Sequence, residues 1–172
     1  WIRSFTNYTS TFGDVASWTA QTGNTIGSHP RDTLIDQSFP KGIAFAEWLL
    51  SAGATTTAGH LTISSQVKPT TIDQINPPAQ RWIYEPAVPA QPTGAAQYTH
   101  YLSFNAPVGA AAANQCGRFV YTGLHVTDTA SDPGDNTSTS SPATFPACCA
   151  TGTLSPQEKA LEFMIFDLSS CI

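Results

Sequence analysis

Cysteine and histidine carry the most reactive side chains in this 172-residue chain, and a thiol beside an imidazole is the pattern of a nucleophilic enzyme. Cys116 and His125 are nine residues apart on one predicted strand. At about 3.3 Å per residue they lie roughly 30 Å apart, so they are not partners. His100, on a neighbouring predicted strand, is the other candidate partner of Cys116, unless a disulfide uses that thiol.

All four cysteines fall in predicted loops or at the ends of predicted elements: Cys116, Cys148, Cys149 and Cys171. An even number of cysteines in a chain rich in Thr and Ser is typical of an oxidising, extracellular compartment. We therefore expect a secreted or cell-surface protein with two disulfides. Four cysteines allow three connectivities. A ring between adjacent Cys148 and Cys149 strains the backbone, so we expect one to pair with Cys116 and the other with Cys171. Metal ligation is the alternative, although no Cys-x-x-Cys spacing is present.

Carboxylates gather in the polar stretch 128–141, where Asp128, Asp132 and Asp135 stand close together. Oxygen ligands of this kind suit a hard cation such as calcium, although the spacing does not match an EF-hand loop. A solvated polar loop is the alternative interpretation. The four histidines are dispersed and form no His-x-His or His-x-x-x-His pair, so no histidine metal site is indicated.

Aromatic residues on predicted strands, or at their rims, are candidates for ligand binding: Trp82, Tyr84, Tyr98 and Tyr101. Two such rings exposed together form a platform on which the apolar face of a sugar can stack. Ordinary core packing is the alternative for each of them.

Composition excludes two classes of partner. The chain has seven Lys and Arg and a net charge of −5, so no basic patch for nucleic acid can be assembled. No apolar run reaches the roughly 18 residues needed to span a bilayer, so we expect no membrane insertion. Charged residues make up 11% of the chain, and Thr, Ser, Asn and Gln must therefore supply its solubility.

Two stretches carry helix signals. Ser155 and Glu158 form a capping box around Pro156, and apolar residues then recur at helical spacing up to Leu168. The second stretch begins after Ser38-Phe39-Pro40 and is apolar almost without a break, until Gly53 stands at the position of a left-handed C-cap. Because both helices are apolar on more than one side, we expect both to be largely buried.

Four segments are predicted as strands, 59–67, 81–84, 98–105 and 118–126, and loops rather than crossover helices join them. Residues 118–126 are apolar on both faces, as in a central strand covered on both sides. The order predicts an α+β fold with a mainly antiparallel sheet and two buried helices. We assign this domain to residues 36–172 and expect residues 1–35 to be an irregular Thr- and Ser-rich segment.

Five segments together resemble the C-terminal region of large secreted bacterial proteins: 36–42, 80–84, 101–109, 116–121 and 154–171. That region is similar to the ThuA-like branch of the class I glutamine-amidotransferase-like fold, in which a Gly-Arg-Val-Phe/Tyr strand ends near a histidine and a last helix follows. Gly117-Arg118-Phe119-Val120-Tyr121 with His125 matches this pattern. The resemblance implies the C-terminal part of a flavodoxin-like or ThuA-like domain, with His125 as the candidate catalytic residue. The parallel βα units that precede this region in the family are missing here.

These observations favour a non-catalytic extracellular domain that serves structure, adhesion or self-assembly, as a homo-oligomer or a filament. A weakly charged surface lets copies pack together with little electrostatic repulsion. Two alternatives remain open: a carbohydrate-binding module with a glycan partner, and a fragment of a ThuA-like enzyme that acts on sugars.

Overall fold

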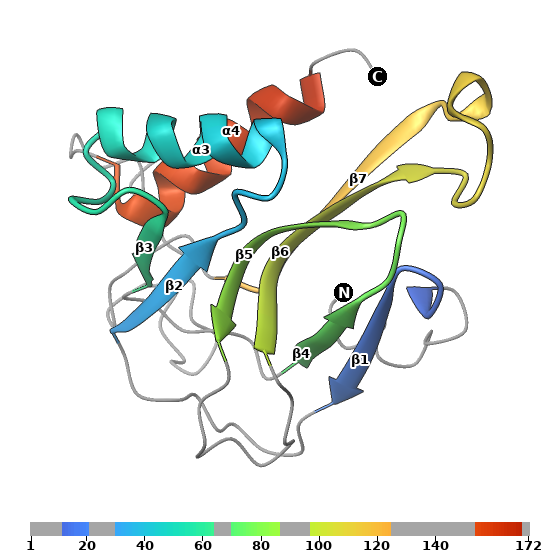
Figure 1. Ribbon diagram of the computed structural model, residues 1–172, viewed down its shortest axis with the longest axis horizontal. Helices are drawn as coiled ribbons and strands as arrows, with labels where there is room; N and C mark the ends of the chain where they lie inside the picture. The colour runs from blue at the N-terminus through green and yellow to red at the C-terminus, as the bar shows by residue number, and fades with distance from the viewer. Residues whose placement is uncertain (1–11, 21–29, 64–69, 87–96, 125–153, 170–172) are drawn as a thin grey trace, which may run out of the picture.

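Seven strands in the described part of the chain form one curled sheet, and every neighbouring pair is antiparallel (Figure 1). The structure, a computed structural model, describes residues 12–20, 30–63, 70–86, 97–124 and 154–169. The strands are β1 (Ala16–Ala20), β2 (Arg31–Ile35), β3 (His60–Ile63), β4 (Thr70–Ile75), β5 (Gln80–Pro86), β6 (Gln97–Ala106) and β7 (Gly117–Thr122). The helices are α3 (Pro40–Ser51), α4 (Pro156–Ser169) and the short 3₁₀ turn η1 (Ala112–Asn114). The predicted α+β class with a mainly antiparallel sheet is confirmed.

The long strand β6 is the centre of this sheet, whose order is β1-β4-β6-β5-β2-β3 with β7 paired to β6. β5 lies along one edge of β6. On the other edge β6 pairs with β4 at Thr99 and then with β7 from Tyr101 to Ala106. One strand therefore joins three neighbours.

The two faces of β6 belong to two separate apolar cores, because successive side chains of a strand point to opposite faces. Tyr101 lies in the core beneath the helices. Leu102 and Phe104 lie in a second core on the opposite face, together with Val15 and Tyr121. The main core lies between sheet and helices and is formed by Ile35, Phe45, Ala46, Leu49, Ala54, Leu61, Ile63, Trp82, Ile83, Tyr101, Leu124, Ala160 and Met164.

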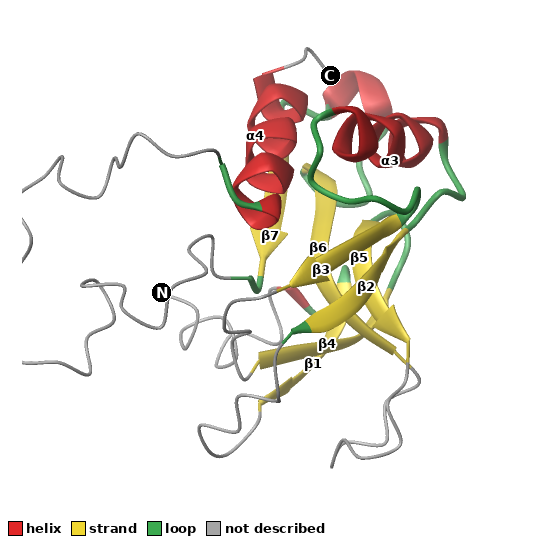
Figure 2. Ribbon diagram, turned by 90° about the vertical axis from the view of Figure 1, so that its left-hand side faces the viewer, coloured by secondary structure: helices red, strands yellow, loops and turns green. Residues whose placement is uncertain are grey.

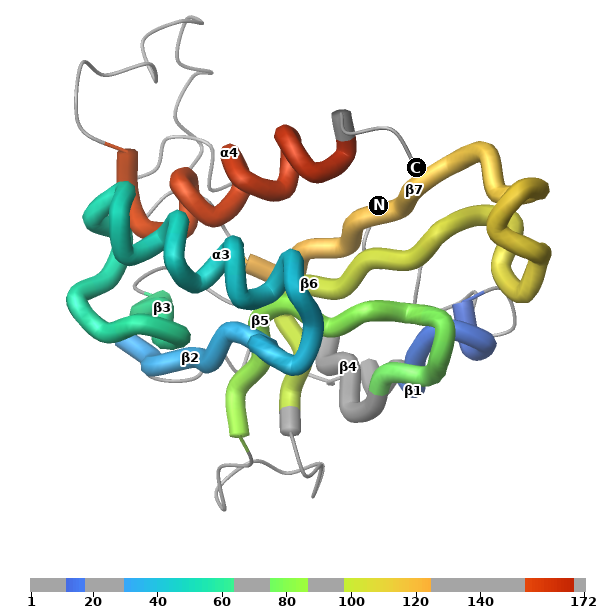
Figure 3. The backbone as a smooth tube through the Cα atoms, turned by 45° about the horizontal axis from the view of Figure 1, so that its top comes forward, coloured from blue at the N-terminus to red at the C-terminus, as the bar shows by residue number. Residues whose placement is uncertain are grey.

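Both helices lie on the same side of the sheet, with β1 and β4 farthest from them (Figure 2). They run side by side and antiparallel (Figure 3). Two contacts each join the start of one helix to the end of the other. Lys41 at the start of α3 pairs with Asp167 near the end of α4, with Nζ 2.6 Å from Oδ1. At the other end Lys159 Nζ donates to the carbonyl of Ala52 over 2.8 Å.

The signals that start and stop the helices act as the sequence predicts. The backbone N–H of Glu158 donates to Ser155 Oγ over 3.2 Å, and the N–H of Ser155 donates to Glu158 Oε2 over 2.7 Å, which completes the capping box. Pro40 opens α3, and Gly53 follows its end with a φ of 67°, which is the left-handed conformation that glycine adopts without strain.

Three predictions about the strands were wrong. Residues 1–35 were expected to be irregular, yet they contain β1 and β2, and β2 lies between β3 and β5. The segment after β3, expected to be a loop, contains β4. β7 was expected to be a central strand, but within the described residues it pairs only with β6. Its apolar groups on both faces pack against α4 on one side and the second core on the other, which gave it the appearance of a central strand.

Candidate functional site

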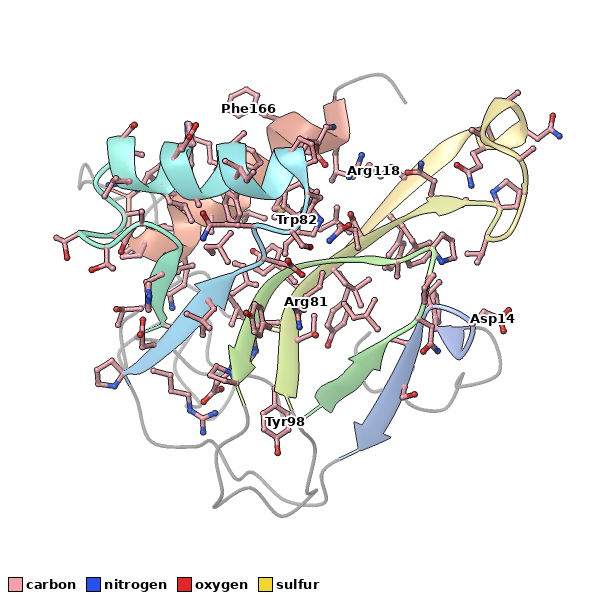
Figure 4. All side chains as sticks on the ribbon, in the orientation of Figure 1. Asp14, Arg81, Trp82, Tyr98, Arg118 and Phe166 are labelled. Atoms are coloured by element: carbon pink, nitrogen blue, oxygen red, sulfur yellow. The ribbon has the colours of Figure 1, made fainter. Side chains whose placement is uncertain are left out.

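The four aromatic residues expected to bind a sugar do not form an exposed platform. Trp82, Tyr98 and Tyr101 are buried, and Trp82 lies between the helices and the sheet (Figure 4). Tyr84 is half-buried, and the guanidinium of Arg81 lies 3.7 Å from the centre of its ring. Stacking on a sugar needs an accessible ring face. Of the four, only Tyr84 is accessible at all.

The other predicted site residues lie mostly outside the described residues. These are His125, the calcium candidates Asp128, Asp132 and Asp135, and the cysteines Cys148, Cys149 and Cys171. Calcium binding and the two disulfides therefore stay predictions.

Cys116 is exposed just before β7 and forms no disulfide within the described part of the chain. The register of β6 and β7 pairs Ala106 with Gly117 and Tyr101 with Thr122. His100 therefore lies at the far end of this hairpin from Cys116, about 20 Å away. A pair of Cys116 with His100 is therefore excluded.

A buried cluster of charged groups joins β2, β5 and β6, and sequence reasoning missed it. Glu85 Oε2 lies 2.9 Å from Arg31 Nη1 and 3.4 Å from His100 Nε2. Burial alone would raise the pKa of Glu85, but the hydrogen bond with His100 and the Arg31 guanidinium outweigh it and hold the pKa below its usual range. All three side chains are largely enclosed, so the cluster links three strands rather than presenting a base to a substrate.

This cluster predicts a loss of stability in acid. Because the pKa of Glu85 is lower in the folded protein, the unfolded chain takes up the proton first as the pH falls. The stabilisation is complete above the ordinary carboxyl pKa of about 4.3 and is lost as the pH falls through the lower folded-state pKa. The free energy of unfolding of Glu85→Gln, measured with urea, should therefore change less with pH below about pH 5 than that of the parent. Parallel pH profiles for the two proteins would contradict this assignment.

The surface most suited to binding is the outer face of the two helices. Seven large apolar side chains are exposed in the described part of the chain, and six belong to α3, α4 or the residue just before the α4 cap. We call these six residues the helical surface: Ile43, Leu50, Leu154, Ile165, Phe166 and Leu168. Phe166 is 64% exposed and points away from the sheet, and Ile165 is 56% exposed (Figure 4). The expectation that both helices are buried was therefore wrong, because a two-layer fold covers each helix on one side only.

A buried carboxylate positions α4 beneath this surface. Asp167 accepts from Lys41 on α3 and lies 2.9 Å from Arg118 Nη2 on β7. Arg118 points toward α4 (Figure 4), and its Nη2 also donates to Ser103 Oγ over 3.3 Å. The sequence gives no signal for this link, since its members lie on three separate elements.

Neither described helix is long and apolar enough to cross a lipid bilayer. Among the described residues, no group of three His, Cys, Asp or Glu side chains is placed to hold a metal ion. Comparison with protein-family models, curated proteins and solved structures finds no match for this chain.

Proposed function

We propose that this chain is a non-catalytic domain of a secreted or cell-surface protein, and that it associates with a second copy of itself through the helical surface. The observation that carries the proposal is that, of the seven large apolar side chains exposed in the described part of the chain, six belong to the two helices or to the residue before the α4 cap. Exposed apolar patches of this kind mark interaction surfaces in soluble proteins. A chain with 11% charged residues also meets little electrostatic opposition when copies approach.

The charges on α3 favour a second copy as the occupant. Lys41, Ala44 and Glu47 follow one another at intervals of three residues and are all exposed. When two α3 helices pair antiparallel about Ala44, the half-exposed Lys41 of each copy, which also pairs with Asp167 of its own chain, lies opposite Glu47 of the other. The small side chain of Ala44 lets the two helices approach at this point. Such an isologous contact is the commonest form of protein dimer.

Replacing Ile165 by aspartate should weaken self-association by at least about tenfold, because it places a charge in the middle of an apolar contact. Sedimentation velocity over a range of protein concentrations measures the effect. Ile165 is exposed, so the monomer should keep its fold and its far-ultraviolet circular dichroism spectrum.

The matched control is Val108→Asp. Val108 is the remaining exposed large apolar residue of the described chain and lies between β6 and η1, outside the helical surface. This variant should associate as the parent does. A parent that stays monomeric at every concentration, or equal losses in both variants, would count against the proposal.

The finer resemblance, to the C-terminal part of a flavodoxin-like or ThuA-like domain, rests on the strand at Gly117–Thr122 and the helix that follows it. The described strand pairs are all antiparallel, whereas the family has parallel βα units. Self-association through the helices does not depend on this relationship. An enzyme fragment would instead require His125, and loss of a sugar-directed activity in His125→Ala would support that alternative.

A further inference from the structure

The face of the sheet turned away from the helices carries a group of polar side chains on three neighbouring strands. Along β2 and β3 burial alternates, so Thr33, Ile35, Leu61 and Ile63 are buried beneath the helices. The residues between them point the other way. The register pairs Asp32 with Thr62, and Leu34 with His60 on β3 and with Tyr84 on β5. We call these five residues the outer strip: Asp32, Leu34, His60, Thr62 and Tyr84.

At one end of the outer strip a carboxylate orients an imidazole. Asp32 Oδ2 lies 2.8 Å from His60 Nδ1, and the two side chains are 61% and 38% exposed. The second carboxylate oxygen and Nε2 of His60 have no hydrogen-bond partner among the described residues. Since Nδ1 is engaged, the ring is held with Nε2 available to a ligand.

At the other end the ring of Tyr84 is held in place. Arg81 lies over the ring, and its own Nε donates to Asp36 Oδ2 over 2.9 Å. Within the described chain the Tyr84 hydroxyl has no hydrogen-bond partner. His60 and Tyr84 are separated by β2, which is two strand spacings, or about 10 Å. Half-buried Leu34 lies between them.

We propose that the outer strip binds a neutral sugar, with one ring lying over Leu34 and its hydroxyls bonded to Asp32, His60 and Tyr84. The spacing suits one pyranose ring, and carboxylate, imidazole and phenol supply the acceptors and donors that sugar hydroxyls need. The exposed carboxylate of Asp32 disfavours anionic ligands, and the guanidinium of Arg81, which lies over the Tyr84 ring, is paired with Asp36. Because the strip faces away from the helices, this proposal stands apart from the self-association proposed above.

The test is a titration of ¹⁵N-labelled protein with methyl α-mannoside, methyl β-glucoside and methyl β-galactoside, followed by NMR. At least one glycoside should change the amide chemical shifts of the outer strip in a saturable way. Asp32→Ala should weaken that binding about tenfold, and Tyr84→Phe, which removes only the hydroxyl, about fivefold. The matched control is Asp14→Ala, since Asp14 is also exposed but precedes β1 and lies away from the strip (Figure 4); it should bind as the parent does. Each variant is checked for an unchanged spectrum outside the strip.

Three outcomes would overturn the proposal. The first is the absence of a saturable shift at the outer strip with all three glycosides. The second is unchanged affinity in Asp32→Ala. The third is a response of the strip to inorganic phosphate or to calcium chloride while the glycosides have no effect, since this would assign the strip to ions.

Discussion

Replacing Trp82 by alanine is expected to lower the free energy of unfolding by about 3–5 kcal/mol, the usual cost of removing a fully buried large aromatic side chain. Trp82 is completely buried, and its ring contacts Phe39 and Phe45 on the α3 side and Phe163 on α4, with centroids 4.9, 5.9 and 6.1 Å away. Its removal leaves a cavity between sheet and helices that rigid elements cannot close. Urea unfolding followed by circular dichroism measures the change.

Two variants separate the contributions to this effect. Trp48 also contacts Phe163, at 5.6 Å, but it is only partly buried, so Trp48→Ala should cost clearly less. Trp82→Phe keeps a ring in place but removes the 2.8 Å hydrogen bond from Nε1 to Ser103 Oγ, which should cost about 1–2 kcal/mol. An equal loss of stability in Trp82→Ala and Trp48→Ala would contradict this prediction, because it would show that the buried Trp82 stabilises the main core no more than the partly buried Trp48 does.

Replacing Asp167 by asparagine is expected to cost about 3 kcal/mol, because it leaves a largely buried arginine without its counter-charge. The side chain of Asp167 is 4% exposed and lies between Lys41 and Arg118. Asparagine has nearly the same volume, so the loss reports charge rather than packing. The free energy of unfolding, again measured with urea, gives the effect.

Lys41→Met is the control for this pair. The side chain of Lys41 is 50% exposed, and removing a half-exposed member of an ion pair should cost less than about 1 kcal/mol. Similar losses in Asp167→Asn and Lys41→Met would show that the contact between Asp167 and Arg118 does not stabilise the packing of α4 on β7.

The helices and the strands β5 and β6 could be predicted because their signals are local. The capping box at Ser155 and Glu158, Pro40 and Gly53 each act within one turn of chain. β1, β2 and β4 were missed because polar residues interrupt their apolar pattern. Their stability comes from neighbouring strands that are distant in the sequence. β2, for example, pairs with β3 and β5.

The exposed faces of the helices could not be predicted, since an apolar residue looks the same in the sequence whether it is covered or not. Ile43 and Ile165 belong to the same apolar stretches as Ala46 and Met164, yet the first two are exposed and the last two are buried. Only the position of the sheet decides which of them face solvent.

No sequence motif could predict the charged pairs, because the two members of each pair are distant in the sequence. Arg31 and Glu85 are 54 residues apart, and Asp32 and His60 are 28 apart. The sequence does contain one relevant signal, because the segment Arg31-Asp32-Thr33-Leu34-Ile35 follows Pro30 and forms a strand. Predicting this strand would have identified Arg31 and Asp32 as residues of the sheet.

The central claim, that copies join through their helices, is tested most directly by isotope-filtered NMR on a mixture of methyl-labelled and unlabelled protein. Nuclear Overhauser effects between copies should involve the methyl groups of Ile43, Ile165 and Leu168 and should be lost on dilution. Intermolecular effects confined to Val108 or to other residues outside the helical surface, or none at the highest concentration, would contradict the account.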